Sequence, residues 1–327
     1  MTTARAVSGT TGEEALLVLI PVFNDWDCVE VVLAELDRVL QACGRRADAL
    51  LVDDASTDAL GEGLAPRGAI ASVRVLHLRC NLGHERAICV GLSYAHDQMA
   101  AETVVIMDGD GEDRPEDVPR LLDELEREGG RCVVFAARLR RSENLIFRLG
   151  YLFYQLIHRL LVGRPIEVGS FSALPRRILS GLVVMPQLWN HYAAAVAASR
   201  TPWISIPTHR GARIRGESRL DLIALVVHGI SALSVYSERI AVRVLLASAV
   251  LGSVISVAIG ALLFSQWSAG AAASGWAAAL LIGFSVALLL IIALATSFSV
   301  MTLSTRSRAH FVPLEGCPLY VRELREL

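Results

Sequence analysis

The sequence contains no lysine, so every basic side chain is an arginine or a histidine. Codon usage explains this bias more simply than ligand binding does, although the forked guanidinium group of arginine suits phosphate oxygens. The formal net charge is only −2, so the protein has no broad positive field of the kind that attracts nucleic acid. We therefore expect no nucleic-acid partner.

Paired cysteines and an N-terminal apolar segment are also missing. The six cysteines are scattered without a C-x-x-C pair, which suits a reducing compartment and offers no zinc framework. Residues 1–14 are mostly small and polar, so we expect a disordered lead-in and no cleaved signal peptide. The eight histidines show no metal-ligand spacing, and we interpret them as structural or surface residues, apart from His84.

Charged residues are absent from 244 to 305. Segments 244–264 and 276–298 are each long enough to cross a bilayer, which takes about 20 apolar residues. A buried helical hairpin of a soluble protein is the alternative, but the length and the lack of charge disfavour it. We expect a transmembrane hairpin of two helices.

The flanking charges predict the orientation of this hairpin. Arginines stand just before and just after it, at Arg239, Arg243, Arg306 and Arg308. The positive-inside rule then places both termini and the N-terminal domain in the cytoplasm. We expect an integral protein of the cytoplasmic (inner) membrane, in which residues 306–327 form a cytoplasmic tail.

The N-terminal part of the chain alternates between short apolar runs and amphipathic segments. The runs predict strands at 15–22, 49–52, 73–78, 104–107, 132–137 and 204–207. Helical spacing of apolar residues predicts helices at 28–40, 86–96, 119–128 and 176–184. This alternation predicts an α/β fold with a mostly parallel sheet and helices on both faces.

Two further amphipathic segments are expected. Residues 144–161 have an apolar face that suits either a membrane surface or the cover of a sheet, and both readings stay open. Residues 220–243 form a membrane-proximal amphipathic helix. A single α/β domain is then expected at 15–219, followed by the membrane hairpin at 244–305.

Polar clusters follow the predicted strands one after another. The fourth strand ends in the sequence DGDGED, which begins at Asp108 and includes Asp110, Glu112 and Asp113. Alone, this stretch would be interpreted as a solvated acidic loop. Ligands bind at the carboxyl ends of strands in open α/β sheets, and crowded carboxylates suit a hard divalent cation. The recurrence of such clusters therefore favours a cation site, and Asp113 alone is left unassigned.

A strongly basic segment, residues 209–219, follows the last predicted strand of the domain. Several arginine forks can grip phosphate oxygens with charge-assisted hydrogen bonds. The segment is thus either an ordinary solvated loop or an anion clamp.

Five motifs in order resemble those of the family 2 glycosyltransferases with a GT-A fold. Within this family the chain resembles the polyprenyl-phosphate glycosyltransferases, the branch of dolichyl-phosphate mannose synthase and the undecaprenyl-phosphate glucosyltransferases. The motifs are 21–25 (PVFND), 53–58 (DDASTD), 81–83 (NLG), 108–112 (DGDGE) and 213–219 (RIRGESR). Each motif is weak alone, but five in order followed by two apolar spans make a specific pattern from residue 17 to about residue 303.

The resemblance implies roles for particular residues. It implies a nucleotide-sugar pocket formed by Pro21, Phe23, Asp25, Leu51, Asp53, Asp108 and Gly109. It implies a divalent cation, Mg²⁺ or Mn²⁺, held by Asp108, Asp110 and Glu112. It implies that the acceptor phosphate is bound by Arg213, Arg215, Ser218 and Arg219. The residues expected to carry catalysis are Asp110, Arg138, Arg213 and Arg219.

The chain departs from the family pattern at three positions. Asp25 stands where glutamate is usual, Glu112 where glutamine is common, and Arg219 where lysine is usual. The extra charge of Glu112 puts the choice of metal in doubt. The Q-x-x-R-W signature of processive synthases is absent, which argues for transfer of a single sugar.

The expected reaction is an inverting, metal-dependent transfer of one sugar from a UDP-glucose or GDP-mannose type donor to a polyprenyl phosphate. A phosphate acceptor is already ionised near neutral pH and needs no strong base, whereas a hydroxyl acceptor does. A diacylglycerol or ceramide acceptor is the alternative, with Glu167 and Glu217 as the available bases. A non-catalytic membrane scaffold fits less well, as does a flippase or channel component, since the spans carry no charge. The sugar, the nucleotide, the chain length of the lipid and the metal stay open, and self-association is compatible with the sequence.

Overall fold

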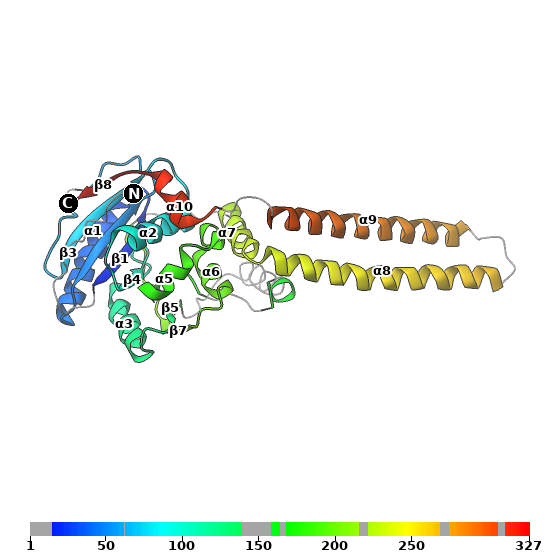
Figure 1. Ribbon diagram of the computed structural model, residues 1–327, viewed down its shortest axis with the longest axis horizontal. Helices are drawn as coiled ribbons and strands as arrows, with labels where there is room; N and C mark the ends of the chain where they lie inside the picture. Colours follow the sequence, from blue (N-terminus) through cyan, green and yellow to red (C-terminus); the bar gives the residue numbers. More distant parts are fainter. Residues whose placement is uncertain are drawn as a thin grey trace, which may run out of the picture. The chain divides into compact units, whose positions relative to one another are not determined.

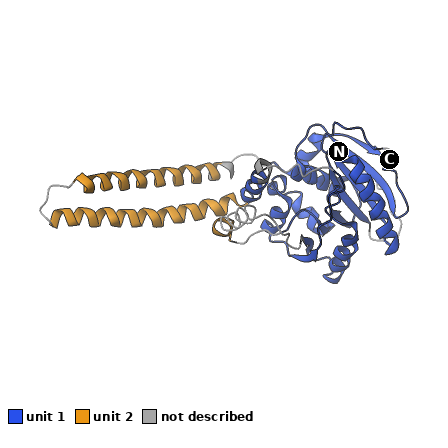
Figure 2. Cartoon of the chain, turned by 180° about the vertical axis from the view of Figure 1, so that it is seen from behind, with its two compact units in different colours: residues 1–144, 166–235, 311–327 blue, residues 145–165, 236–310 orange. Residues whose placement is uncertain are grey.

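The computed structural model describes residues 15–61, 63–138, 158–163, 168–215, 222–268, 275–306 and 311–327. Ser218 and Arg219, two of the predicted site residues, lie outside these ranges, as do Glu167 and Glu217 and most of the predicted helix at 144–161. The chain divides into two compact units. The first comprises residues 1–144, 166–235 and 311–327, and the second comprises 145–165 and 236–310 (Figure 2).

The first unit is built on one eight-stranded sheet with the strand order β7-β5-β6-β4-β1-β2-β3-β8 (Figure 1). The strands are β1 (Leu16–Val22), β2 (Ala47–Asp53), β3 (Ile70–Leu78), β4 (Thr103–Ile106), β5 (Val133–Arg138), β6 (Ser172–Pro175), β7 (Trp203–Thr208) and β8 (Val321–Glu326). β4, β1, β2 and β3 are parallel neighbours, and β7 pairs in parallel with β5. β6 and the edge strand β8 run antiparallel to their neighbours. The predicted mostly parallel α/β sheet is therefore confirmed.

Helices cover both faces of this sheet. The helices of the first unit are α1 (Trp26–Ala42), α2 (His84–Gln98), η1 (Pro115–Asp117), α3 (Val118–Arg127), α5 (Arg176–Leu182), η2 (Pro186–Trp189), α6 (Tyr192–Ala198), α7 (Leu222–Ser234), α10 (Pro313–Gly316) and η3 (Cys317–Tyr320).

The strands are apolar on both sides because both faces are covered. Successive side chains of a strand point to opposite faces, and β1 shows the result. Val18 and Ile20 belong to the core cluster that also holds residues of α1 and α3. Leu17 and Leu19 belong to the cluster that holds residues of α2, α5 and α6. All four side chains are fully buried, so each face of the sheet has its own core.

Two segments differ from the expectations. The single helix expected at 220–243 is two helices, because α7 ends at Ser234 and α8 begins at Ser237. The segment expected as a tail supplies a strand instead, since β8 pairs with β3 along its length. Aromatic side chains also attach the C-terminal segment to the first unit: the ring centroids of Phe311 and Trp189 lie 4.4 Å apart. Residues 311–327 therefore belong to the first unit.

The second unit contains two long helices, α8 (Ser237–Ser268) and α9 (Gly275–Arg306). Both are long and apolar enough to cross a membrane. A helix of 32 residues measures about 48 Å, so each exceeds the hydrocarbon core of a bilayer, which is about 30 Å thick. The two helices pack on each other, and a Cβ added to Gly252 would lie 3.2 Å from Leu288 Cδ1.

Candidate active site

The acidic loop, residues 108–113, follows β4 at the carboxyl end of the sheet. Its shape is set by two of its own carboxylates. Asp113, which is 2% exposed, accepts a hydrogen bond from the Asp108 amide at 2.9 Å. Asp110 Oδ1 accepts one from the Glu112 amide, also at 2.9 Å. The buried Asp113 carboxylate thus fixes the shape of the loop. The other carboxylates of the loop belong to Asp108, Asp110 and Glu112.

Gly109 lets this loop lie tightly against the sheet. A Cβ at this position would come within 2.7 Å of Val29 Cγ2 in α1 and 2.9 Å of Ile20 Cγ2 in β1. No real Cβ tolerates such distances, so a larger residue would push the loop outward. The packing of the loop thus accounts for glycine at this position, and the role of Gly109 at the donor site stays a prediction.

The basic loop, residues 209–215, follows β7 and lies directly on the acidic loop. The Gly211 amide donates to the Glu112 carbonyl at 2.9 Å, and the Ile214 amide donates to the Asp110 carbonyl at 3.0 Å. A Cβ on Gly211 would lie 2.2 Å from the Gly111 carbonyl oxygen, so only glycine permits this approach. Gly111 itself has φ +87°, a left-handed conformation that favours glycine. Two glycines therefore allow the two loops to meet.

Ion pairs join the side chains of the two loops. Arg210 pairs with Glu112 through a close contact. Arg213 Nη1 lies 3.7 Å from Asp110 Oδ2, and its Nη2 donates to Asp25 Oδ2 at 3.2 Å. The Arg213 side chain is only 18% exposed, so these charges interact with limited screening by water. A further, well-exposed pair joins Arg215 of the loop to Asp27.

Asp110 is crowded by other carboxylates. Burial raises the pKa of this carboxyl, and the negative charges of Asp108 and Glu112 raise it further. The Glu112 amide and the Arg213 guanidinium oppose the rise but do not cancel it. A divalent cation at this loop would relieve the same repulsion, and carboxylate oxygens are the ligands that hard cations prefer.

His84 adds a second positive group beside the acidic loop. Its Nε2 lies 3.5 Å from Asp108 Oδ1, and its side chain is 43% exposed. Burial lowers the pKa of His84, but the carboxylates of Asp108, Glu85 and Asp113 raise it more, for a net rise. The carboxylates thus stabilise the protonated ring relative to a free imidazole.

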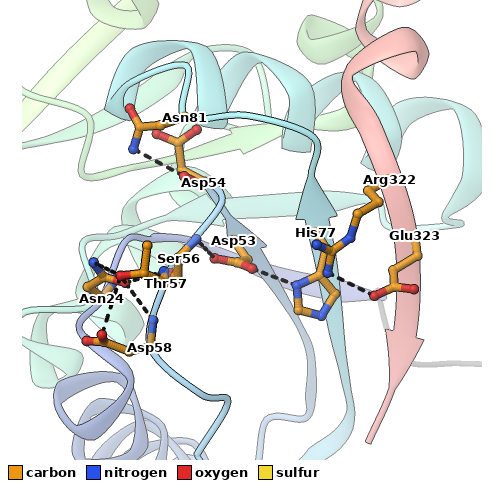
Figure 3. A network of polar contacts seen from close by, with 10 residues as sticks. All are labelled: Asn24, Asp53, Asp54, Ser56, Thr57, Asp58, His77, Asn81, Arg322 and Glu323. Carbon is orange, nitrogen blue, oxygen red and sulfur yellow. Dashed lines mark hydrogen bonds and ion pairs between the residues drawn. The ribbon is translucent and has the colours of Figure 1, made fainter.

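The end of β2 is held by a separate polar network, which Figure 3 shows. Asp53 is 5% exposed; its Oδ2 lies 2.6 Å from His77 Nδ1, and its Oδ1 accepts from the Ser56 amide at 2.9 Å. The neighbouring Asp54 accepts from the amides of Leu82 and Gly83 at 2.7 and 2.8 Å. The DDASTD and NLG motifs are thus tied together through carboxylates.

Asn24 ties the first motif to the second in the same network (Figure 3). Its Oδ1 accepts from the amides of Thr57 and Asp58 at 2.7 and 3.1 Å. Asn24 has φ +55°, a left-handed backbone conformation that asparagine tolerates better than most residues. The polar clusters after β1, β2 and β3 therefore form one hydrogen-bonded edge, as their order in the sequence predicts.

The predicted site residues lie in different surroundings. Phe23 is 38% exposed at the end of β1, next to the partly buried Pro21. Leu51 is fully buried in the core between the sheet and α1, so its side chain packs inside the domain. Arg138 is the last residue of β5, and only its backbone belongs to the described structure.

Three residues that organise this edge were not among the predicted site residues. Arg210 holds Glu112, Asp54 holds the loop after β3, and His77 holds Asp53. Arg210 could have been predicted from the sequence, because it lies in the basic segment at residues 209–219. His77 lies inside an apolar strand, and only the pairing of β3 with β2 brings it to Asp53.

The arrangement suits chemistry on an anionic leaving group. Carboxylates that can hold a cation lie opposite guanidinium groups, and both come from loops at the carboxyl ends of strands. Such preorganised charges stabilise negative charge that develops in a reaction.

Comparison with known proteins identifies the family of this chain. Residues 17–182, about half of the chain, match the family model described as glycosyl transferase family 2. An uncharacterized glycosyltransferase, YkcC, of Bacillus subtilis (strain 168) is 22% identical over 68% of this chain and 68% of its own length. The undecaprenyl-phosphate 4-deoxy-4-formamido-L-arabinose transferase of Klebsiella pneumoniae (strain 342) is 26% identical over 64% of this chain. The alignment spans 63% of the length of that transferase, less than two thirds.

Solved structures with a similar arrangement are more distant. Mannosyl-3-phosphoglycerate synthase from Rubrobacter xylanophilus has a TM-score of 0.48 at 18% identity, covering 69% of this chain and 73% of its own. Glucosyl-3-phosphoglycerate synthase from Mycobacterium tuberculosis, in complex with Mn²⁺, UDP-glucose and phosphoglyceric acid, has a TM-score of 0.47 at 18% identity, covering 69% of this chain and 80% of its own. From its sheet, its motifs and the family model, the chain belongs to glycosyl transferase family 2 and is a glycosyltransferase with a GT-A-like domain and two apolar C-terminal helices.

Proposed function

We propose that the protein transfers one sugar from a nucleotide-sugar to a polyprenyl phosphate at the cytoplasmic face of a membrane. The observation that carries this proposal is the apposition of the acidic and basic loops, joined by Arg213 and Asp110 at 3.7 Å. The name of the undecaprenyl-phosphate transferase relative supports the acceptor, and the two apolar helices support the membrane location.

The donor side of the reaction is assigned to the acidic loop. Asp108 and Asp110 would hold a divalent cation, Mg²⁺ or Mn²⁺, and the crowding of carboxylates around Asp110 fits that role. When bound, the cation would supply Lewis-acid stabilisation of the leaving diphosphate. Glu112, the third predicted ligand, is engaged by Arg210, which would compete with the cation for its carboxylate.

The edge formed after β1 and β2 would bind the nucleoside part of the donor. Pro21 lies near the end of β1, Phe23 and Asp25 follow it, and Asp53 ends β2. Asp53 is already fixed by His77 and Ser56, so its carboxylate is preorganised. Less conformational entropy is lost on binding when the side chain that binds the substrate is already ordered.

The acceptor side is assigned to the arginines of the basic loop and to Arg138, Ser218 and Arg219. A lipid phosphate is ionised near neutral pH, so one of its oxygens can attack the anomeric carbon without a strong general base. The new C–O bond forms as the bond to the diphosphate breaks, and the diphosphate leaves with the electron pair. Attack from the opposite side inverts the anomeric configuration. Arginine forks hold the acceptor phosphate through charge-assisted hydrogen bonds.

A substrate panel tests the proposal. The full chain in membranes is incubated with labelled UDP- and GDP-sugars, polyprenyl phosphate and Mg²⁺ or Mn²⁺, with and without EDTA. We expect label in the lipid fraction for one donor class, and loss of that label with EDTA. Parallel reactions contain diacylglycerol or ceramide in place of the lipid phosphate. Label in a hydroxyl lipid alone, or transfer that EDTA leaves unchanged, would overturn the acceptor or the metal assignment respectively.

A further inference from the structure

Three metal-binding side chains from three helices meet outside the two loops. Glu85 lies in the first turn of α2, His191 immediately precedes α6, and His228 lies in α7. Each offers one ligand atom, and these atoms all lie within 4.8 Å of one another. No sequence spacing connects them, which is why the histidines were interpreted as structural or surface residues.

Hydrogen bonding among the three groups does not explain their convergence. His191 Nδ1 lies 3.7 Å from Glu85 Oε2, and His228 Nδ1 lies 3.7 Å from Glu85 Oε1. Both distances exceed the usual limit of about 3.2 Å for an N–H···O hydrogen bond. The two imidazole rings lie side by side, with centroids 4.7 Å apart. Three ligand groups therefore face a common point at ion-pair distances, beyond the length of a hydrogen bond.

The surroundings hold two of the three groups firmly in place. The Glu85 side chain is 14% exposed and that of His191 is 7% exposed. Glu85 Oε2 accepts a hydrogen bond from the Tyr192 amide at 2.8 Å, which fixes the carboxylate. The Ala194 amide lies 3.4 Å from His191 Nδ1, a long hydrogen bond that metal coordination through this nitrogen would replace. A nearly buried carboxylate is costly without a positive partner, and a cation at this point would provide one.

The donor set and the spacing fit zinc. Two histidines and one glutamate are a known ligand set for zinc with an open fourth position. Zinc bonds of about 2.0–2.2 Å in tetrahedral geometry place ligand atoms about 3.3–3.4 Å apart. The two histidine nitrogens lie 3.7 Å from different oxygens of Glu85, and one ligand atom from each of the three residues lies within 4.8 Å of the others. Zinc binding would therefore draw the three side chains closer together. Mg²⁺ prefers oxygen ligands, so this mixed set differs in preference from the carboxylates of the acidic loop.

We propose that Glu85, His191 and His228 form a zinc-binding site that fastens α7 to α2 and α6. The fourth zinc position remains available for water or an anion. Glu85 directly follows His84, whose ring contacts Asp108 of the acidic loop. Zinc at this position would therefore restrain the first turn of the helix that carries His84.

Zinc binding to the purified full chain tests the proposal without any measurement of transfer. The protein in detergent is stripped of metal, the chelator is removed, and Zn²⁺ is titrated in competition with a chromophoric chelator. The variants are His228→Ala, which removes an exposed ligand with little risk to folding, and His96→Ala, which removes another histidine of the first unit. Asp110→Asn reports any zinc taken up by the acidic loop.

We expect one tightly bound zinc in the unmodified protein, in His96→Ala and in Asp110→Asn. The affinity for zinc should fall at least about tenfold in His228→Ala. Loss of a residue that merely hydrogen-bonds a metal ligand already costs about that much, and His228 is proposed as a ligand itself. Co²⁺ bound in place of zinc should show the visible absorption of a tetrahedral site, and His228→Ala should lose it. Absence of tight zinc, equal binding by His228→Ala, or loss of binding in Asp110→Asn would each overturn the assignment. None of these outcomes depends on whether the protein transfers sugar to a lipid.

Discussion

Arg213 of the basic loop lies 3.7 Å from Asp110 of the acidic loop, although the two residues are far apart in the sequence. The same guanidinium group donates to Asp25 after β1, so one arginine connects the ends of two central strands with the loop after β7. In the proposed reaction this group would exchange carboxylate partners for phosphate oxygens. The pairs thus hold the arginine in position before substrates bind.

Replacement of Asp110 by asparagine should abolish most of the turnover. The change keeps the shape of the side chain but removes a charge from the acidic loop, and loss of one preorganised electrostatic group costs about 10²–10³-fold in rate. The measurement is kcat for sugar transfer at saturating donor and metal. Asp97→Asn, at an exposed position of α2, is the matched control and should keep full activity. Wild-type turnover by Asp110→Asn with unchanged circular dichroism would remove Asp110 from the mechanism.

Arg213 should not tolerate lysine. Its two terminal nitrogens contact two different carboxylates, and the single ammonium group of lysine cannot reproduce that fork. We expect Arg213→Lys and Arg213→Gln both to lower kcat/KM for the lipid phosphate by more than tenfold. Arg177→Gln, which replaces an exposed arginine in α5, should leave this value unchanged. Full activity of the lysine variant would show that charge alone suffices.

Arg210 should influence the metal requirement. It pairs with Glu112, so it competes with a cation for the Glu112 carboxylate. Arg210→Gln should therefore lower the Mg²⁺ or Mn²⁺ concentration for half-maximal activity several-fold. Arg127→Gln, which removes an exposed ion pair with Glu124, serves as the control. If Arg210→Gln needs the same or a higher metal concentration, Glu112 is not a metal ligand and serves only to bind the basic loop.

Gly211→Ala should separate the two loops. The added Cβ would lie 2.2 Å from the Gly111 carbonyl oxygen, and backbone atoms cannot rotate out of the way. We expect a strong loss of activity and a fall in the free energy of unfolding of about 1–3 kcal/mol, which is typical of overpacking.

Gly181→Ala in α5 is the control for this change, because no atom lies within 4 Å of an added Cβ there. Alanine favours helix over glycine by about 0.5–1 kcal/mol, so this variant should be equally or more stable. Paired thermal unfolding and transfer assays compare the two proteins. Normal activity in Gly211→Ala would mean that the close contact between the loops is dispensable.

The sequence was sufficient to predict the elements with strong local patterns. The apolar run before Asp108 and the uncharged stretch after Val244 identify a buried strand and two apolar helices without knowledge of the fold. The order of polar clusters after successive strands also predicted that they share one edge, because parallel strands end at the same side of a sheet. Asn24 and Thr57, which are joined by hydrogen bonds, illustrate that outcome.

Contacts between segments remote in sequence could not be predicted in this way. β8 has the composition of an exposed charged tail, and only its hydrogen bonds to β3 make it a strand. The convergence of Glu85, His191 and His228 depends on the placement of three helices. The pairing of Arg210 with Glu112 depends on two glycines that bring loops together. Each of these features follows from tertiary packing, which local periodicity does not encode.

The position of β8 also sets an order of events during synthesis. This strand is made after both apolar helices, yet it pairs with β3, which is made before either of them. The sheet of the catalytic domain is therefore completed only after the whole hairpin has left the ribosome. Until then, the outer edge of β3 lacks its hydrogen-bonding partner, and unpaired strand edges are prone to aggregation. Completion of the sheet therefore follows synthesis of both apolar helices.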